Sequence, residues 1–381
     1  MNFWRWFAAI AVVLHANHAE AAIPDSERNA LLTFYFSTNG PSWNTNTGWG
    51  DAAGTECSWH GVTCDAAQTT VVQISLSANN LTGTLPDLSR LTNLVQFDVS
   101  NNFLTGSIPP LSGMGALADF NVDDNLLTSS IPSLTGLQSL NSFDAGNNRL
   151  TGSIPSLAGL TNLGIFIVGN NQLSGSIPSF TGLGFISFDA SHNQLTGSIP
   201  PLGNMPLLEV FVVEFNNLTG TIPSLGGLQS LQYFRVDSNQ LTGGIPDFSG
   251  LPLQDFRVDR NQLTGPIPPF GVGGPVIFNA EHNKLTGSIP DLSSAYNVQR
   301  FFVAGNQLTG SVPPVFMNSP PYGPGNPPYY MVAATLCPNL LTTSASANDD
   351  VWNAVTGATP WWATPFPTNR CDELFTDRFG G

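Results

Sequence analysis

Carboxylates are the only side chains of this sequence abundant enough to suggest chemistry by their number. The chain of 381 residues carries 26 Asp and Glu against 11 Lys and Arg, for a formal net charge of -15. It contains no His-Glu-x-x-His run, no Gly-x-Ser-x-Gly elbow and no glycine-rich phosphate loop, which zinc hydrolases, serine hydrolases and nucleotide-binding enzymes need. We therefore expect no enzyme activity, no metal site and no cofactor. A hydrolase that uses two Asp residues is the remaining alternative.

The net charge limits the possible partners, and the apolar amino terminus indicates the compartment. Nucleic-acid binding needs Lys and Arg to neutralise phosphates, so an acidic chain argues against it. Residues 1–21 combine Arg5, an apolar run over 6–14 and an Ala-x-Ala exit at 19–21, which is typical of a secretory signal peptide. The run is shorter than the about 20 residues that span a bilayer, although an uncleaved anchor is the alternative. We expect a secreted or extracytoplasmic protein, located outside the cell, at its surface or in a periplasm.

The elements that position the side chains come from one repeat. The string Asn-x-Leu-Thr-Gly recurs every 22 or 23 residues, with Ser in place of one Gly and one Thr. Its eleven copies begin at Asn79, Asn102, Asn125, Asn148, Asn171, Asn193, Asn216, Asn239, Asn261, Asn283 and Asn306. A period this strict indicates a solenoid, in which each unit stacks on its neighbours.

Each repeat has apolar residues eight, five and three positions before its Asn, as Leu94, Phe97 and Val99 precede Asn102. The middle position is Phe in ten repeats and Ile74 in the first. Alternate residues of a strand point to the same face, and one repeat cannot bury them alone. We predict that these side chains and the repeated Asn point inward and serve the fold.

The Leu-x-x-Leu-x-Leu-x-x-Asn-x-Leu spacing is that of leucine-rich repeats, and Leu-Thr-Gly-x-Ile-Pro, as at 150–155, resembles their plant extracellular class. That class includes polygalacturonase-inhibiting proteins and receptor-kinase ectodomains. The segment 30–32, Trp43 and the run from Cys57 to Cys64 resemble its amino-terminal cap, in which a helix and a Cys-paired hairpin cover the first repeat. The resemblance implies an α/β leucine-rich-repeat solenoid, a curved right-handed array with a parallel sheet on its concave face. Most units are one residue shorter than the plant pattern.

Four segments follow from this organisation: a signal peptide (1–21), an amino-terminal cap (22–70), eleven repeats (71–315) and a carboxy-terminal cap (316–381). Eleven strands at about 4.8 Å spacing separate the caps by roughly 50 Å, whereas a disulfide needs Cα atoms within about 7 Å. The cysteines should therefore pair inside each cap, and the expected disulfides are Cys57–Cys64 and Cys337–Cys371. The aromatic residues of the second cap are expected to shield Phe301. Alternatively, Trp361 and Trp362 form a carbohydrate-binding patch.

The concave face is where a ligand should bind. Residues seven, six, four, two and one before each Asn should point to solvent there, so burial does not dictate their type. The early repeats are acidic, the middle ones carry apolar residues and the late ones mix Tyr, Arg and carboxylates. The candidate ligand-binding residues are Asp98, Asp144, Ile165, Ile167, Asp189, Val210, Val212, Glu214, Phe215, Tyr233, Arg235, Asp237, Arg257, Asp259 and Glu281. His192 and His282 lie four repeats apart, about 19 Å, and cannot share a metal.

One column of this face holds carboxylates in four consecutive repeats, namely Glu214, Asp237, Asp259 and Glu281. Like charges on adjacent strands are destabilising. Either Arg235 and Arg257 in the adjacent column neutralise them, or the column binds a basic partner or a cation beside an apolar anchor. We expect a secreted, non-enzymatic recognition module that binds an extracellular protein or peptide, by resemblance an inhibitor or a receptor-like ligand binder. The alternative is a protein that binds cell-wall carbohydrate or a structural protein of the cell surface.

Overall fold

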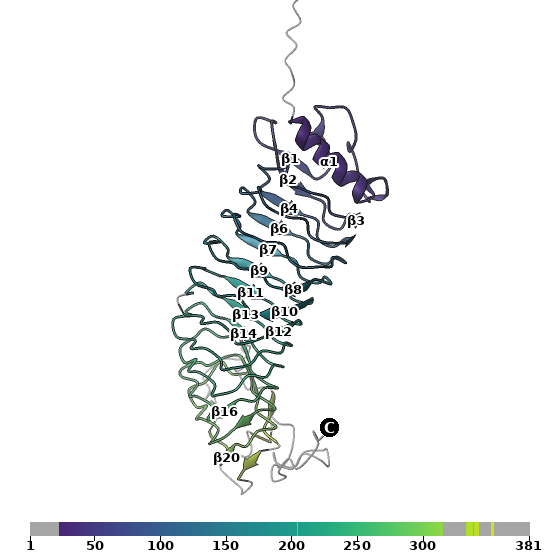
Figure 1. Cartoon of the computed structure of the whole chain (residues 1–381). Coiled ribbons are helices and arrows are strands. Elements are labelled where there is room, and N and C mark those ends of the chain that lie inside the picture. Colours follow the sequence, from purple (N-terminus) through teal and green to yellow (C-terminus); the bar gives the residue numbers. More distant parts are fainter. Residues whose placement is uncertain (1–22, 204, 315–332, 338, 343–351, 354–381) are drawn as a thin grey trace, which may run out of the picture.

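The structure is a computed structural model that describes residues 23–203, 205–314, 333–337, 339–342 and 352–353. It is an elongated array in which one long sheet runs from cap to cap (Figure 1). This main sheet has 13 strands. They are β1 (Val62–Cys64), β2 (Val71–Ser75), β4 (Gln96–Asp98), β6 (Asp119–Asn121), β7 (Ser142–Asp144), β9 (Ile165–Ile167), β11 (Ser187–Asp189), β13 (Val210–Val212), β14 (Tyr233–Arg235), β15 (Asp255–Arg257), β17 (Ile277–Asn279), β19 (Arg300–Phe302) and β21 (Ala333–Thr335). All pairs are parallel except β1 with β2, which confirms the predicted leucine-rich-repeat solenoid.

Shorter parallel sheets lie along the flank of the array (Figure 1). They arise where the Thr-Gly segments of neighbouring repeats pair. Their strands are β3 (Thr82–Thr84), β5 (Phe103–Thr105), β8 (Thr151–Ser153), β10 (Gln172–Ser176), β12 (Gln194–Thr196), β16 (Thr264–Gly265), β18 (Lys284–Leu285), β20 (Thr309–Gly310) and β22 (Leu340–Leu341). The α part of the predicted α/β class is the helix α1 (Asp25–Ser37) in the amino-terminal cap, which the short turns η1 (Gly40–Ser42) and η2 (Glu56–Ser58) follow. Residues 352–353 are also helical.

The Phe of each repeat forms a continuous spine through the core. Because equivalent Phe residues are paired in register, for example Phe166 with Phe188 and Phe188 with Phe211, their rings stack. Ring centroids from Phe97 to Phe301 are 5.4 to 5.8 Å apart. All of these rings are fully buried, as predicted, and each burial stabilises the fold by about 1.5–3 kcal/mol before entropy is counted.

The repeated Asn ties each repeat to the one before it. Asn193 accepts the backbone N–H of Leu173 at 2.8 Å and donates to the carbonyls of Val168 and Ser191, both at 3.0 Å. Its side chain is buried. The amide thus satisfies backbone groups that the strand leaves unpaired as it ends, and the predicted structural role of this residue is confirmed.

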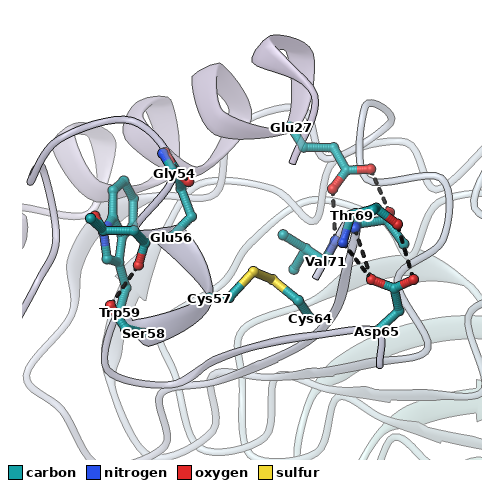
Figure 2. The surroundings of a disulfide bond; sticks show 12 residues. Glu27, Gly54, Glu56, Cys57, Ser58, Trp59, Cys64, Asp65, Thr69 and Val71 are labelled. Atoms are coloured by element: carbon teal, nitrogen blue, oxygen red, sulfur yellow. Dashed lines mark hydrogen bonds between the residues drawn. A yellow bond between two sulfur atoms is a disulfide. The ribbon is translucent and has the colours of Figure 1, made fainter. Parts of the chain in front are cut away.

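The amino-terminal cap covers the first strand with α1 and a disulfide-bonded hairpin. Cys57 and Cys64 are bonded, with Cα atoms 5.4 Å apart, as predicted (Figure 2). Buried Glu27 of α1 accepts the N–H of Val71 at 2.7 Å, which fixes the helix to β2. The ring of Phe34 meets Phe97 edge-on at 6.0 Å, so the cap closes the spine at this end.

The main sheet continues one strand beyond the eleven repeats. Strand β21 pairs with β19 in parallel, and Asn339 accepts the N–H of Leu308 at 3.0 Å as the Asn of the next repeat would. Trp352 is fully buried and donates to the carbonyl of Pro313 at 3.0 Å. The Asn-x-Leu-Thr at 339–342 is the sequence signal for this unit, and a longer spacing from Asn306 hid it.

Cys337 is disulfide-bonded, whereas Cys371, its predicted partner, lies outside the described residues, as do the predicted signal peptide, Trp361 and Trp362. No helix within the described residues is long and apolar enough to cross a membrane.

Candidate ligand-binding face

The outer face of the main sheet, the predicted concave face, carries all fifteen candidate residues. The register confirms the columns: Ile167 pairs with Asp189, Asp189 with Val212, and Val212 with Arg235. Neighbours in a column are therefore about 4.8 Å apart. The candidates extend from the strand that contains Asp98 to the turn after β17, so the structure arranges them as a long strip.

The strip is less exposed than the sequence suggested. Phe215 and Tyr233 are exposed, at 44% and 38%. Ten others are half-buried, namely Asp98, Asp144, Ile165, Ile167, Asp189, Val210, Glu214, Arg235, Arg257 and Glu281. The expectation that Val212, Asp237 and Asp259 face solvent is wrong, because their exposed fractions are only 8%, 6% and 8%. Closely spaced parallel strands let larger neighbouring side chains cover smaller ones.

The two arginines compensate the acidic column only in part, and neither forms an ion pair with it. Arg235 donates two hydrogen bonds to Asp255, at 2.7 and 3.0 Å. Arg257 donates to the same carboxylate at 2.9 and 3.1 Å. Buried Asp255 thus makes the direct ion pairs with both guanidinium groups. From the adjacent column the arginines still lower the pKa of Glu214, and Arg257 lowers that of Asp237, but burial outweighs both effects.

The acidic column is itself under electrostatic strain. Burial and the neighbouring Asp237 raise the pKa of Glu214 to about 7. Burial and Asp237 likewise raise the pKa of Asp259 to about 7, and burial raises the pKa of Asp237. Glu281, at the far end, accepts a hydrogen bond from Thr335 of β21. Near pH 7 Glu214 and Asp259 are therefore poised between their charged and neutral forms.

Phe215 adopts a backbone conformation that bulky residues avoid. It has φ 53°, and positive φ is a feature of this position, directly before the repeated Asn, in other repeats too. The residues there are Asn101, Asp124, Asn147, Asn170, His192, Ser238, Arg260 and His282. Asn tolerates this region far better than Phe. The exposed ring stacks on His192 at 4.4 Å, and the Nε2 atom of His192 lies 3.8 Å from Glu214. The sequence analysis only excluded a metal shared by His192 and His282, and it did not predict this pairing.

The early acidic residues have a structural use. Asp98, Asp144 and Asp189 each accept the backbone N–H two residues later, at 3.0, 3.0 and 2.8 Å. Such bonds cap the end of the strand. Burial and nearby Asp123 and Asp189 raise the pKa of Asp144 to about 6 despite this bond. Among the described residues no three His, Cys, Asp or Glu side chains converge to hold a metal ion.

Comparison with known families matches two segments of the chain. Residues 24–65 match the family described as "Leucine rich repeat N-terminal domain", and residues 93–113 match "Leucine Rich Repeat". The matched segments are the amino-terminal cap and the second repeat of the main sheet.

Solved structures with the same architecture include two receptors. One is the LRR ectodomain of the plant membrane receptor kinase GASSHO1/SCHENGEN3 from Arabidopsis thaliana in complex with CASPARIAN STRIP INTEGRITY FACTOR 2, at 29% identity over 75% of this chain and 42% of that chain, with a TM-score of 0.59. The plant peptide hormone receptor RGFR1 in complex with RGF2 is 30% identical over 65% of this chain and 45% of its own, with a TM-score of 0.57. The chain spans less than half the length of these receptor chains.

A third similar structure is a plant ice-binding protein. It is 25% identical over 66% of this chain, and the match covers 91% of the ice-binding chain with a TM-score of 0.51.

Proposed function

Because the chain is a leucine-rich-repeat protein of the plant extracellular type, we propose that it is a secreted, non-enzymatic recognition module. It binds an extracellular protein or peptide on the outer face of the main sheet. Similar solved structures include a peptide hormone receptor in complex with RGF2, which supports a ligand-binding role. The proposal extends this role to a defined surface of this chain.

Phe215 carries the proposal. An exposed aromatic ring held at positive φ costs folding free energy of about 1–3 kcal/mol, and such strain gathers at functional sites. Half-buried Val210 lies on β13, the strand that precedes Phe215, and half-buried Ile165 and Ile167 lie on β9, two strands away. An apolar cluster rimmed by charged residues is the usual form of a protein interface, and aromatic residues are its frequent hot spots.

The test compares a bait altered on the main sheet with a bait altered on the flank. The first is Phe215→Asn with Tyr233→Ala on the main sheet, and the control is Phe103→Ala, which removes a 56% exposed ring from a flank strand. Mass spectrometry identifies extracellular material retained by each. We expect a protein or peptide that the wild type and the control retain and the double variant loses. A partner retained equally by all three contradicts the proposal, and a retained polysaccharide favours the carbohydrate alternative.

A second candidate function, ice binding, rests on the flank sheet. The exposed hydroxyl groups of Thr151, Ser153, Ser174, Ser176 and Thr196 lie on β8, β10 and β12, with Ser153 paired to Ser174 and Ser176 to Thr196. They are about 4.8 Å apart between strands and about 6.7 Å apart along them. A regular hydroxyl array of this kind can order water in step with its own spacing, and a similar structure is a plant ice-binding protein.

Thermal hysteresis of the purified chain tests this second candidate. Thr196→Lys places a long charged side chain in the array and should abolish the hysteresis, whereas Tyr233→Lys on the main sheet should leave it unchanged. Wild-type protein without hysteresis, or equal loss in both variants, contradicts ice binding by the flank.

A further inference from the structure

Three members of the acidic column form no ion pair with Lys or Arg among the described residues. They are Glu214, Asp237 and Asp259, which follow strands β13, β14 and β15. The hydroxyl of Ser238 donates to the Oδ2 atom of Asp237 at 3.2 Å. More than nine-tenths of Asp237 and of Asp259 is buried. In each of these two residues the Oδ1 atom is buried and has no hydrogen-bond partner. A buried carboxylate oxygen left unpaired is costly, so the column lacks something that would compensate it.

The charged groups around the column supply that compensation only in part. Arg235 and Arg257 form their ion pairs with Asp255. They lower the pKa of Glu214, and Arg257 lowers that of Asp237, by less than burial raises it. Across the column, His192 approaches only Glu214, at 3.8 Å, and Arg260, beside Asp259, is exposed and lowers its pKa less than burial and Asp237 raise it. Asp237 forms no ion pair with a Lys or Arg among the described residues.

We propose that the acidic column binds a basic side chain of the partner, an alkylammonium or guanidinium group, between Glu214, Asp237 and Asp259. This inference rests on the proposed function and names the chemistry of its ligand. A carboxylate shares its charge over both oxygens, so a cation at the exposed edge of the column compensates the whole group. The partner's basic group thereby replaces the ion pair that the chain does not make.

An organic cation fits this column better than a metal ion. The three carboxylates stand in a line, one per strand at about 4.8 Å, and do not converge as metal ligands must. Phe215 directly follows Glu214, and its exposed ring lies on the adjacent column. Cations of Lys and Arg bind favourably to aromatic faces, so the ring and the carboxylates suit the same group.

Binding of a cation should release protons. The pKa of Glu214 and that of Asp259 are raised to about 7, and the pKa of Asp237 is raised as well. A bound cation favours the ionised carboxylates and lowers these pKa values again. Affinity should therefore rise with pH from 5.5 to 8, as the unliganded column loses its protons.

The experiment measures binding of a hexalysine peptide to the full chain by calorimetry, at pH 5.5 and pH 8 and in two buffers of different ionisation enthalpy. The test variant is Asp237→Asn with Asp259→Asn. The matched control is Asp119→Asn with Asp124→Asn, which removes the same charge from an early repeat. We expect wild type and control to bind roughly tenfold more tightly at pH 8 than at pH 5.5, with net proton release. The test variant should lose at least about tenfold in affinity at pH 8.

Equal losses in the test and control variants would show that only net charge attracts the peptide and would overturn the inference. The absence of proton release would also overturn it. So would calorimetry that finds tighter binding of Ca²⁺ alone than of the peptide. The proposed function fails separately, because its bait comparison uses Phe215, Tyr233 and Phe103 and no basic peptide. Loss of hexalysine specificity with a partner still retained on the main sheet would remove the inference and leave the proposed function intact.

Discussion

At the scale of single residues, the repeated Asn and the exposed Phe215 have opposite relations to stability. The Asn side chains satisfy backbone groups at the end of the strand in repeat after repeat. Phe215 is held in a conformation that disfavours it, and its ring is not part of the core. The first kind of residue specifies the fold, and the second marks a place where the fold tolerates a cost.

Replacing Asn193 by Ala should lower the free energy of unfolding by about 2–4 kcal/mol, because the N–H of Leu173 and two carbonyls would lose their buried partner. Chemical denaturation measures the change. The control is Gln194→Ala, since Gln194 is the next residue along and is exposed. An equal effect of both substitutions would contradict the role assigned to the Asn ladder.

Phe215→Asn should leave the free energy of unfolding within about 1 kcal/mol of the wild type. The substitution relieves backbone strain of about 1–2 kcal/mol and gives up a ring contact with His192 worth about 0.5–1.5 kcal/mol. Thermal denaturation checks this balance. A loss of several kcal/mol would mean that the ring belongs to the core and is no ligand anchor.

At the scale of the elements, each of the ten main-sheet strands from β4 to β19 contributes one inward ring to the spine and two side chains to the outer face. The inward positions are uniform, whereas the outward positions differ from strand to strand. This separation lets the sheet change its surface without changing its core, and it also forces carboxylates of neighbouring strands into contact.

Phe188→Ala should cost about 3–5 kcal/mol of unfolding free energy, because the ring is fully buried between Phe166 and Phe211 and its removal leaves a cavity. Phe103→Ala, on an exposed flank position, should cost less than about 1 kcal/mol. Comparable losses at the two sites would contradict the stacked spine.

The acidic column should make the protein less stable as pH rises. The pKa values of Glu214, Asp237 and Asp259 are higher in the folded chain than in the unfolded one. Between about pH 4.5 and 7 the folded state therefore binds more protons, and the free energy of unfolding falls as pH rises. At pH 8, Asp259→Asn should raise unfolding free energy by on the order of 2 kcal/mol, with little effect at pH 4. Asp124→Asn, at an exposed position, should change neither value. A destabilised Asp259→Asn at pH 8 would contradict this assignment.

At the scale of the whole molecule, the solenoid could be predicted because each repeat of the sequence corresponds to one turn of the structure. The Asn-x-Leu-Thr-Gly period sets one strand per turn, and the Phe positions alternate as a buried face requires. The Cys57–Cys64 bond followed from the distance between caps. The unit that contains β21 was not predicted, because the spacing between Asn306 and Asn339 is longer than the repeat period.

The candidate site was harder to predict, because periodicity assigns a side chain to a face but does not give its exposure. Val212 and Asp237 point outward and are nevertheless buried by their neighbours. The choice of Asp255 as the partner of both arginines depends on side-chain reach across strands. Positive φ at Phe215 follows from the shape of the turn, which no single repeat reveals.

The most direct test of the central claim blocks one face at a time. Tyr233→Cys on the main sheet and Thr242→Cys on the flank each place a thiol at an exposed position, where a maleimide-linked polyethylene glycol can be attached to the folded chain. Affinity for the partner that the bait comparison identifies is then measured for both conjugates. The account predicts that the polymer at Tyr233 abolishes binding and that the polymer at Thr242 leaves it unchanged. Full binding with the polymer at Tyr233 would contradict the assignment of recognition to the outer face of the main sheet.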